Sequence, residues 1–252
     1  MAGEGDLPVS EGEGQHSPQR FYVVTAIIAL VMVAAGFGPA MIDTASRRAP
    51  ITGFIIAHGV MTLGWLALYL AQTVLVATRR VYLHRRLGTA GAVLAVPIIL
   101  VGYQTTITMV RRGFDLSGDL LGRIGVPDAT RLLGSTVFPL GGLVQFGVLV
   151  AAALLYRRRP EIHKRLMVLA VVILMAEPLA HLFGHFGIPL RLFGPAFSML
   201  LFSHAIYDRI TRGRMHPVSF WGGLTLSMVN LLSATVVRPS ATWQQFVAWL
   251  AS

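Results

Sequence analysis

The sequence predicts an all-α protein, built as a polytopic bundle of about seven membrane-spanning helices. Three observations predict this fold class. Hydrophobic residues make up 54% of the 252 residues and charged residues only 13%, whereas a soluble domain carries about 25% charged residues. The mean hydropathy is +0.66. The charges gather in short segments between apolar runs of about twenty residues, which is the length that crosses a hydrocarbon core of about 30 Å.

Seven apolar runs are expected to form the spans, at residues 21–42, 51–78, 88–110, 136–156, 164–186, 189–210 and 217–237. Together they define one transmembrane domain over residues 21–238. Residues 1–20 are rich in Gly, Glu and Ser and poor in apolar residues, so we expect a disordered tail there. In residues 239–252, apolar residues recur at i, i+3, i+4 and i+7 from Trp243, which predicts an amphipathic helix in the membrane interface.

The basic residues indicate a membrane partner and an orientation. The formal net charge is +10, but the Arg residues flank apolar runs, which is typical of anchors at anionic lipid rather than of a nucleic-acid interface. The N-terminal tail and the loops predicted on the same side of the membrane carry 13 of the 21 Lys and Arg residues. This bias predicts a cytoplasmic N-terminus. The chain has no Cys, which excludes disulfides, thiolate catalysis and iron–sulfur ligation.

A first group of ionisable residues lies near one membrane boundary. His58 on the second predicted helix and His181 on the fifth each lie about six residues from that boundary, roughly 9 Å deep. Glu177, His181 and His185 are spaced i, i+4, i+8 and so share a helix face. Pro178 has no backbone N–H to donate to the helix, so we expect a kink beside Glu177. We therefore predict a metal site formed by His58, Glu177, His181 and His185, or haem b ligated first by His58 and His181.

A second group lies at the opposite boundary. His84 and His163 stand in the basic segments RRVYLHRRLG and RRRPEIHKRL, which are expected first of all to set the orientation. His204 and Asp208 are four residues apart and share a face of the sixth predicted helix. His84, His163 and His204 are further candidate ligands, because neutral imidazoles bind haem iron and transition metals. The arginines beside them suit a lipid headgroup, a quinone or a haem propionate.

The second helix and the two basic segments resemble a family of uncharacterised bacterial multipass membrane proteins. The resemblance rests on LHRRLG at 83–88, RPEIHKRLM at 159–167, and His58, Trp65 and Gln72. It covers the second to fifth predicted helices. It implies a location in the bacterial inner (plasma) membrane and no established activity.

The step LHRRLG at 83–88 is also similar to the ascorbate-reducible, ferric-reductase-like transmembrane b-type cytochromes. That resemblance implies a four-helix core with bis-histidine haems. Such proteins carry ligands on four successive helices, whereas the predicted helix at 136–156 has no histidine. Two complete haem sites of that kind are therefore not expected, and a single site remains open.

Three functions remain open. The first is a haem- or metal-binding protein of electron transfer with a respiratory-chain or quinone partner. The second is a non-catalytic membrane scaffold or assembly factor. The third is a small proton-coupled transporter that uses Glu177, a function that the lack of an internal sequence repeat disfavours. Whether the protein is an enzyme stays open.

Overall fold

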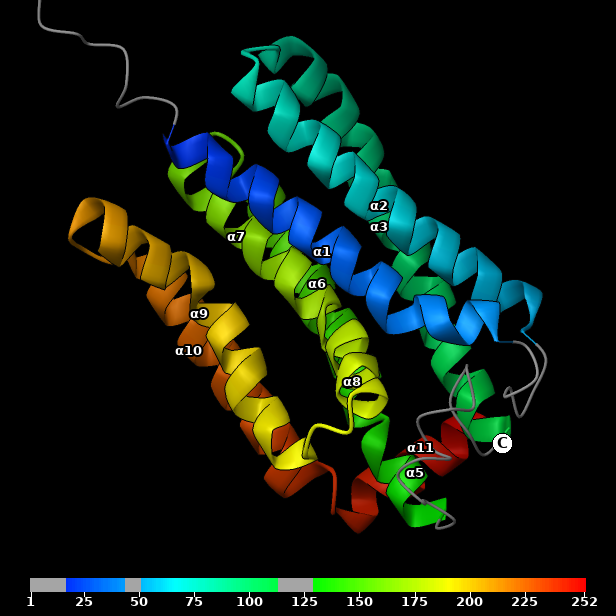
Figure 1. Ribbon diagram of the computed structural model, residues 1–252. Helices are drawn as coiled ribbons and strands as arrows, with labels where there is room; N and C mark the ends of the chain where they lie inside the picture. Colours follow the sequence, from blue (N-terminus) through cyan, green and yellow to red (C-terminus); the bar gives the residue numbers. More distant parts are fainter. Residues whose placement is uncertain (1–16, 44–50, 113–128) are drawn as a thin grey trace, which may run out of the picture.

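The computed structural model describes residues 17–43, 51–112 and 129–252, and within these residues it contains helices and no strands (Figure 1). The all-α prediction is confirmed. The first helix begins at Ser17, so the last four residues of the predicted 1–20 tail are helical. The rest of that tail lies outside the described residues.

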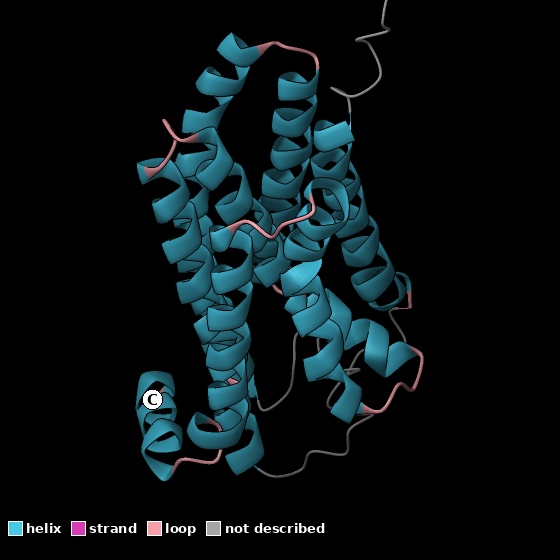
Figure 2. Cartoon of the chain, turned by 90° about the vertical axis from the view of Figure 1, so that its left-hand side faces the viewer, coloured by secondary structure: helices cyan, strands magenta, loops and turns pink. Residues whose placement is uncertain are grey.

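The long helices run side by side (Figures 1 and 2). Helix α7 lies near the centre, because it contacts α1, α6, α9 and α10. Two shorter helices, α5 and α11, pack against each other at one end of the bundle. The helices are α1 (Ser17–Ile42), α2 (Gly53–Ala77), α3 (Val81–Arg112), α5 (Ala129–Ser135), α6 (Val137–Leu155), α7 (Pro160–Leu174), α8 (Ala176–His185), α9 (Phe193–Arg212), α10 (Pro217–Leu232) and α11 (Ala241–Ala251), with a 3₁₀ turn η1 (Leu190–Leu192) and a π-helical turn η2 (Ser233–Val237).

Six helical segments of the described residues are long and apolar enough to cross a membrane. They are Gln19–Ile42, Gly53–Ala77, Val81–Arg111, Thr130–Leu155, Pro160–His185 and Pro217–Val237. The remaining predicted span, residues 189–210, corresponds to α9, which has 20 residues and packs beside α10 but carries Asp208, Arg209 and Arg212 in its last two turns. These charges lower its hydropathy. Two of them, Asp208 and Arg212, form polar contacts with α7.

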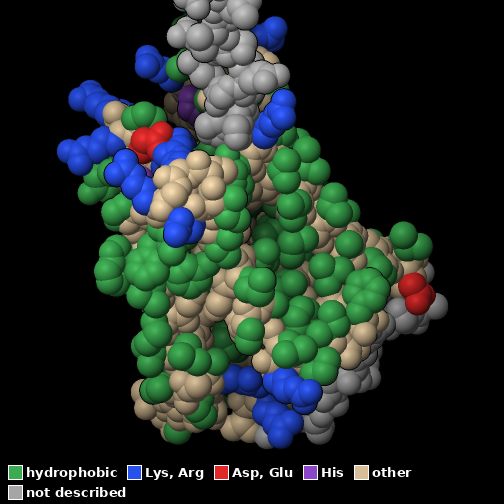
Figure 3. Space-filling model, turned by 60° about the vertical axis from the view of Figure 1, so that its left-hand side comes forward, with side chains coloured by type: hydrophobic (Ala, Val, Ile, Leu, Met, Phe, Trp, Pro, Cys, Tyr) green, Lys and Arg blue, Asp and Glu red, His purple; other side chains and the backbone are tan. Residues whose placement is uncertain are grey.

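The outer surface of the bundle is that of a membrane protein. Large apolar side chains are exposed around its middle, including Leu100 at 63%, Val144 at 65% and Met199 at 68%. In Figure 3 this apolar band separates groups of Lys and Arg side chains at the two ends of the molecule. Such a surface is unfavourable in water and fits the hydrocarbon of a bilayer. The chain is therefore a multipass membrane protein that contacts lipid.

Two helix boundaries differ from the predicted ones. The third helix begins at Val81 rather than residue 88, so the LHRRLG segment is its first two turns instead of a loop. The fifth predicted span begins at Pro160 and is divided at Met175 into α7 and α8. The division is consistent with the predicted kink, because Pro178 stands in the first turn of α8, where a missing N–H is tolerated.

Candidate functional site

The most buried polar contact of the described residues joins α7 to α9. The side chains of Arg165 and Asp208 are both 0% exposed. Arg165 Nη2 donates to Asp208 Oδ1 at 2.8 Å, and Arg165 Nε donates to Asp208 Oδ2 at 3.2 Å. This two-pronged pairing is the geometry that matches a guanidinium to a carboxylate. Each charge is thus compensated inside the bundle.

Further contacts extend this pair toward the surface. Arg165 Nη1 donates to Glu161 Oε2 at 2.6 Å and to the Glu161 carbonyl at 2.7 Å. Arg212 Nη1 donates to the same Glu161 oxygen at 3.1 Å, and Lys164 pairs with the other oxygen. Glu161 itself is half exposed. The network therefore runs from a fully buried ion pair to a solvated carboxylate, and it is held by α7 and α9.

Two more helices join the network through neutral side chains. Ser219 of α10, 1% exposed, donates its hydroxyl to Asp208 Oδ2 at 3.2 Å. On α1, the Tyr22 hydroxyl lies 3.0 Å from His204 Nε2. His204 Nε2 lies 3.9 Å from Asp208 Oδ1. The ring of Phe21 stacks on the His204 ring, with centroids 4.8 Å apart. The group is called the four-helix network below, because α1, α7, α9 and α10 all contribute to it.

The two histidines of the basic segments come together near the same end of the bundle. The rings of His84 on α3 and His163 on α7 have centroids 6.4 Å apart and planes at 81°. His163 Nδ1 lies 2.8 Å from the Ala153 carbonyl, to which it must donate. That bond leaves the lone pair on Nε2, which is the usual arrangement of a metal-binding histidine. His84 Nδ1 is buried without a hydrogen-bond partner among the described residues.

The predicted first group has a different arrangement. Glu177 is exposed on α8, whereas His181 is 6% exposed and packs on the ring of Phe37 from α1. His185 Nε2 donates to the Gly36 carbonyl at 2.9 Å. A Cβ placed on Gly36 would lie 2.7 Å from the Pro178 carbonyl oxygen. Helices α1 and α8 therefore approach closely here because Gly36 has no side chain.

His58, the proposed partner of His181, has its own surroundings. A Cβ on Gly102 of α3 would lie 3.2 Å from His58 Cε1 and 2.7 Å from a methyl carbon of Leu143 on α6. His58 thus packs toward α3 and α6, while His181 packs against α1. Within the described residues, no three His, Asp or Glu side chains lie close enough together to hold a metal ion. The structure does not gather the four predicted metal ligands into such a group.

An apolar segment separates the two levels of polar side chains. Val168, Leu169, Ala170 and Val171 of α7 are each at most 1% exposed, and Val172 and Ile173 are 4% exposed. They lie between Arg165 and the Glu177–His185 region along the same helical segment. Six residues of helix correspond to about 9 Å. Along α7 this stretch offers no polar side chain that would relay a proton between the two levels.

Sequence reasoning recognised the members of the four-helix network only in part. His204 and Asp208 were paired by their spacing, but Arg165, Tyr22 and Ser219 were missed. One signal was available: only Glu161, Glu177 and Asp208 are acidic in residues 129–252. The pairing of His84 with His163 was also missed, although both histidines precede two basic residues and a Leu.

No protein-family model, curated protein or solved structure matches this chain. The fold and the exposed apolar belt define its class, a multipass helical membrane protein.

Proposed function

We propose that the protein is a non-catalytic membrane scaffold, whose internal polar groups hold its helices in a fixed arrangement. One observation supports this proposal: the buried charged groups of the four-helix network are paired with one another and with neighbouring polar side chains. Both oxygens of Asp208 accept hydrogen bonds, and all three nitrogens of Arg165 donate them. A catalytic or transporting carboxylate needs an oxygen that meets substrate or solvent.

The same arrangement disfavours the transporter hypothesis. A proton-coupled carrier needs ionisable groups connected to both sides of the membrane. The apolar stretch Val168–Ile173 lies between the four-helix network and Glu177 on α7 and α8. Glu177 is exposed on the surface of the bundle rather than enclosed within it. A scaffold needs no such connection. We further propose a cytoplasmic N-terminus, because 13 of the 21 Lys and Arg residues belong to the side of the bundle where α1 begins.

The cofactor content of the purified protein tests the scaffold proposal. The full chain is expressed in a host supplied with haem precursor and metals, purified in detergent, and examined by absorption spectroscopy and elemental analysis. We expect no Soret band and less than one transition metal per chain. A haem or metal bound in stoichiometric amount, and lost in His58→Ala or His181→Ala, would overturn the proposal in favour of the predicted redox function.

A second candidate function is metal binding at His84 and His163. It is favoured by the 6.4 Å distance between their ring centroids and by the bond from His163 Nδ1 to the Ala153 carbonyl. Imidazole nitrogens suit Zn²⁺, Cu²⁺ and Ni²⁺. Calorimetric titration of the purified protein with each ion tests this candidate. We expect binding that His84→Ala and His163→Ala both abolish and that His216→Ala, outside the pair, leaves unchanged. Equal binding in all three variants would exclude the pair as the site.

A further inference from the structure

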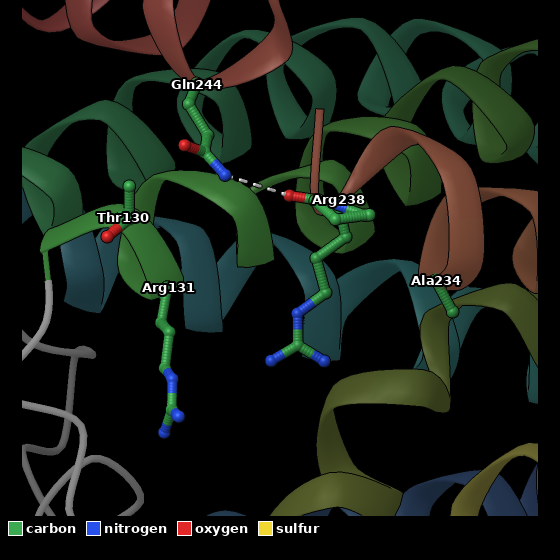
Figure 4. A pocket seen from close by; sticks show the side chains of 6 residues that line it. Thr130, Arg131, Ala234, Arg238 and Gln244 are labelled. Carbon is green, nitrogen blue, oxygen red and sulfur yellow. Dashed lines mark hydrogen bonds between the residues drawn. The ribbon is translucent and has the colours of Figure 1, made fainter. Parts of the chain in front are cut away.

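An open cavity lies at the end of the bundle opposite the start of α1. Its volume is about 320 Å³, and it is lined by side chains from α5, η2, α11 and the turn between the last two elements: Thr130, Arg131, Ala234, Arg238, Pro239 and Gln244. Figure 4 shows the side chains of Arg131 and Arg238 extending in the same direction from two separate elements. We propose that this cavity binds the phosphate of an anionic phospholipid headgroup.

The local backbone fixes Arg238 at the cavity. The turn η2 is π-helical, and the N–H of Arg238 donates to the Ser233 carbonyl at 2.8 Å, five residues back. Such a turn rotates the following residue relative to an α-helix, and π-turns are frequent at functional sites. A Cβ on Gly134 of α5 would lie 2.5 Å from the Arg238 carbonyl oxygen. Gln244 Nε2 also donates to that oxygen, at 3.4 Å. The backbone of Arg238 is thus held while its side chain reaches into the cavity.

The charge of the cavity indicates an anionic ligand. Two guanidinium groups line it. Among the described residues, no acidic side chain lines it or forms an ion pair with either arginine. A guanidinium donates two parallel N–H bonds to a phosphate, so a pair of them provides a site for one phosphate group. The Thr130 hydroxyl and the Gln244 amide lie among the lining side chains. Arg165 differs in this respect, because a buried carboxylate already satisfies it.

The surroundings identify lipid as the source of the phosphate. Helix α11 packs against α5 and α3, and Arg111 Nε donates to the Ala251 carbonyl at 2.9 Å, which holds the last turn of α11. Phe246 and Trp249 of α11 are 45% and 68% exposed. Their rings stack with centroids 6.1 Å apart. Exposed aromatic side chains beside a basic cavity are typical of the membrane interface, where headgroup phosphates lie.

Lipid binding by the full-length protein in detergent tests the proposal. Native mass spectrometry counts phosphatidylglycerol and phosphatidylcholine molecules retained by the wild type and by R131Q/R238Q. The matched control is Arg191→Gln, which removes an exposed arginine of η1 at the same end. We expect retention of phosphatidylglycerol over phosphatidylcholine. Its affinity should fall about fivefold for each cavity arginine removed and stay unchanged in the control.

Three outcomes would overturn the proposal. The first is equal retention of phosphatidylglycerol by the wild type and R131Q/R238Q, and the second is an equal loss in Arg191→Gln. The third is competition by inorganic phosphate at the lipid's own concentration, which would assign the cavity to free phosphate instead. If R131Q/R238Q loses helical content, R131K/R238K decides: lysine keeps the charge without the paired N–H bonds, so we expect weaker retention, and unchanged retention would contradict the site.

Discussion

The segment from Arg157 to Phe186 contains two polar regions with opposite outcomes. Its end, with Glu177, His181 and His185, has the ionisable residues expected of an intramembrane site, yet Glu177 is exposed and the histidines make local contacts with α1. Its basic start resembles a simple orientation signal, yet Arg165 is fully buried and paired with Asp208. A basic residue next to a span is therefore not always at the surface. Whether such a residue is buried depends on the helix face on which it lies and on its partner on the neighbouring helix.

Breaking the Arg165–Asp208 pair should have the largest effect. Asp208→Leu leaves a buried guanidinium without its carboxylate, and losing one partner of a buried pair costs about 3–5 kcal/mol. The double variant R165M/D208L removes both charges and should cost much less. Unfolding in mixed micelles by increasing SDS measures both. Arg209→Ala, an exposed arginine of the same helix, is the control, and a double variant as unstable as Asp208→Leu would contradict the pairing.

The close approach of α1 and α8 should give the next largest effect. Gly36→Ala places a Cβ 2.7 Å from the Pro178 carbonyl oxygen, so the two helices must separate, at a cost of about 1–3 kcal/mol. Gly38→Ala is a matched control two residues away, where a Cβ meets no atom within 4 Å. The same SDS titration compares the two. Equal stability of the two variants would show that this contact does not hold the Glu177–His185 region.

Removing the Tyr22 hydroxyl should have a smaller effect. Tyr22→Phe keeps the ring and deletes the contact with His204 Nε2. The net contribution of one such hydrogen bond to stability is about 0.5–1.5 kcal/mol. Tyr82→Phe, at a tyrosine that is 67% exposed, should leave the midpoint of unfolding unchanged. A similar shift in both variants would remove Tyr22 from the four-helix network.

The smallest effect is expected at His216, which precedes α10. Its Nδ1 accepts the N–H of Val218 at 3.2 Å and so caps the helix. Burial is the main cause that lowers the pKa of His216 below its usual value of 6.5, with the charge of Arg165 adding to it. The fold thus favours the neutral ring, whose stabilising contribution is present above pH 6.5 and is lost as the pH falls. His216→Asn keeps a cap without this titration. Its stability relative to the wild type should rise as the pH falls, and a constant difference would contradict the cap.

The fold was largely predictable from the sequence, because the lengths of the apolar runs determine where helices cross a bilayer. The residues at which the helices begin and end were less predictable. Nothing in residues 81–88 breaks a helix, and α3 therefore continues through the basic LHRRLG segment. With Asp208, Arg209 and Arg212 near its end, α9 is not among the six described segments that are apolar enough to cross a membrane, although it packs beside α10.

The candidate site was less predictable than the fold. Spacing along one helix places His204 and Asp208 on one face, but it does not show which helix faces them. The contact of Asp208 with Arg165 depends on how α7 and α9 are rotated toward each other. The same holds for His58 and His181. Their similar predicted depth in the membrane does not show toward which helix each side chain points. The prediction of haem at these two histidines stays a prediction.

The comparison of Asp208→Asn with Glu177→Gln tests the central claim most directly. Each variant exchanges one carboxylate for the amide of the same shape, one in the four-helix network and one in the Glu177–His185 region. Measured in the same micelles, Asp208→Asn should lower the free energy of unfolding by several times as much as Glu177→Gln. An equal or larger loss in Glu177→Gln would show that the exposed carboxylate of α8, and not the buried pair, holds the bundle together.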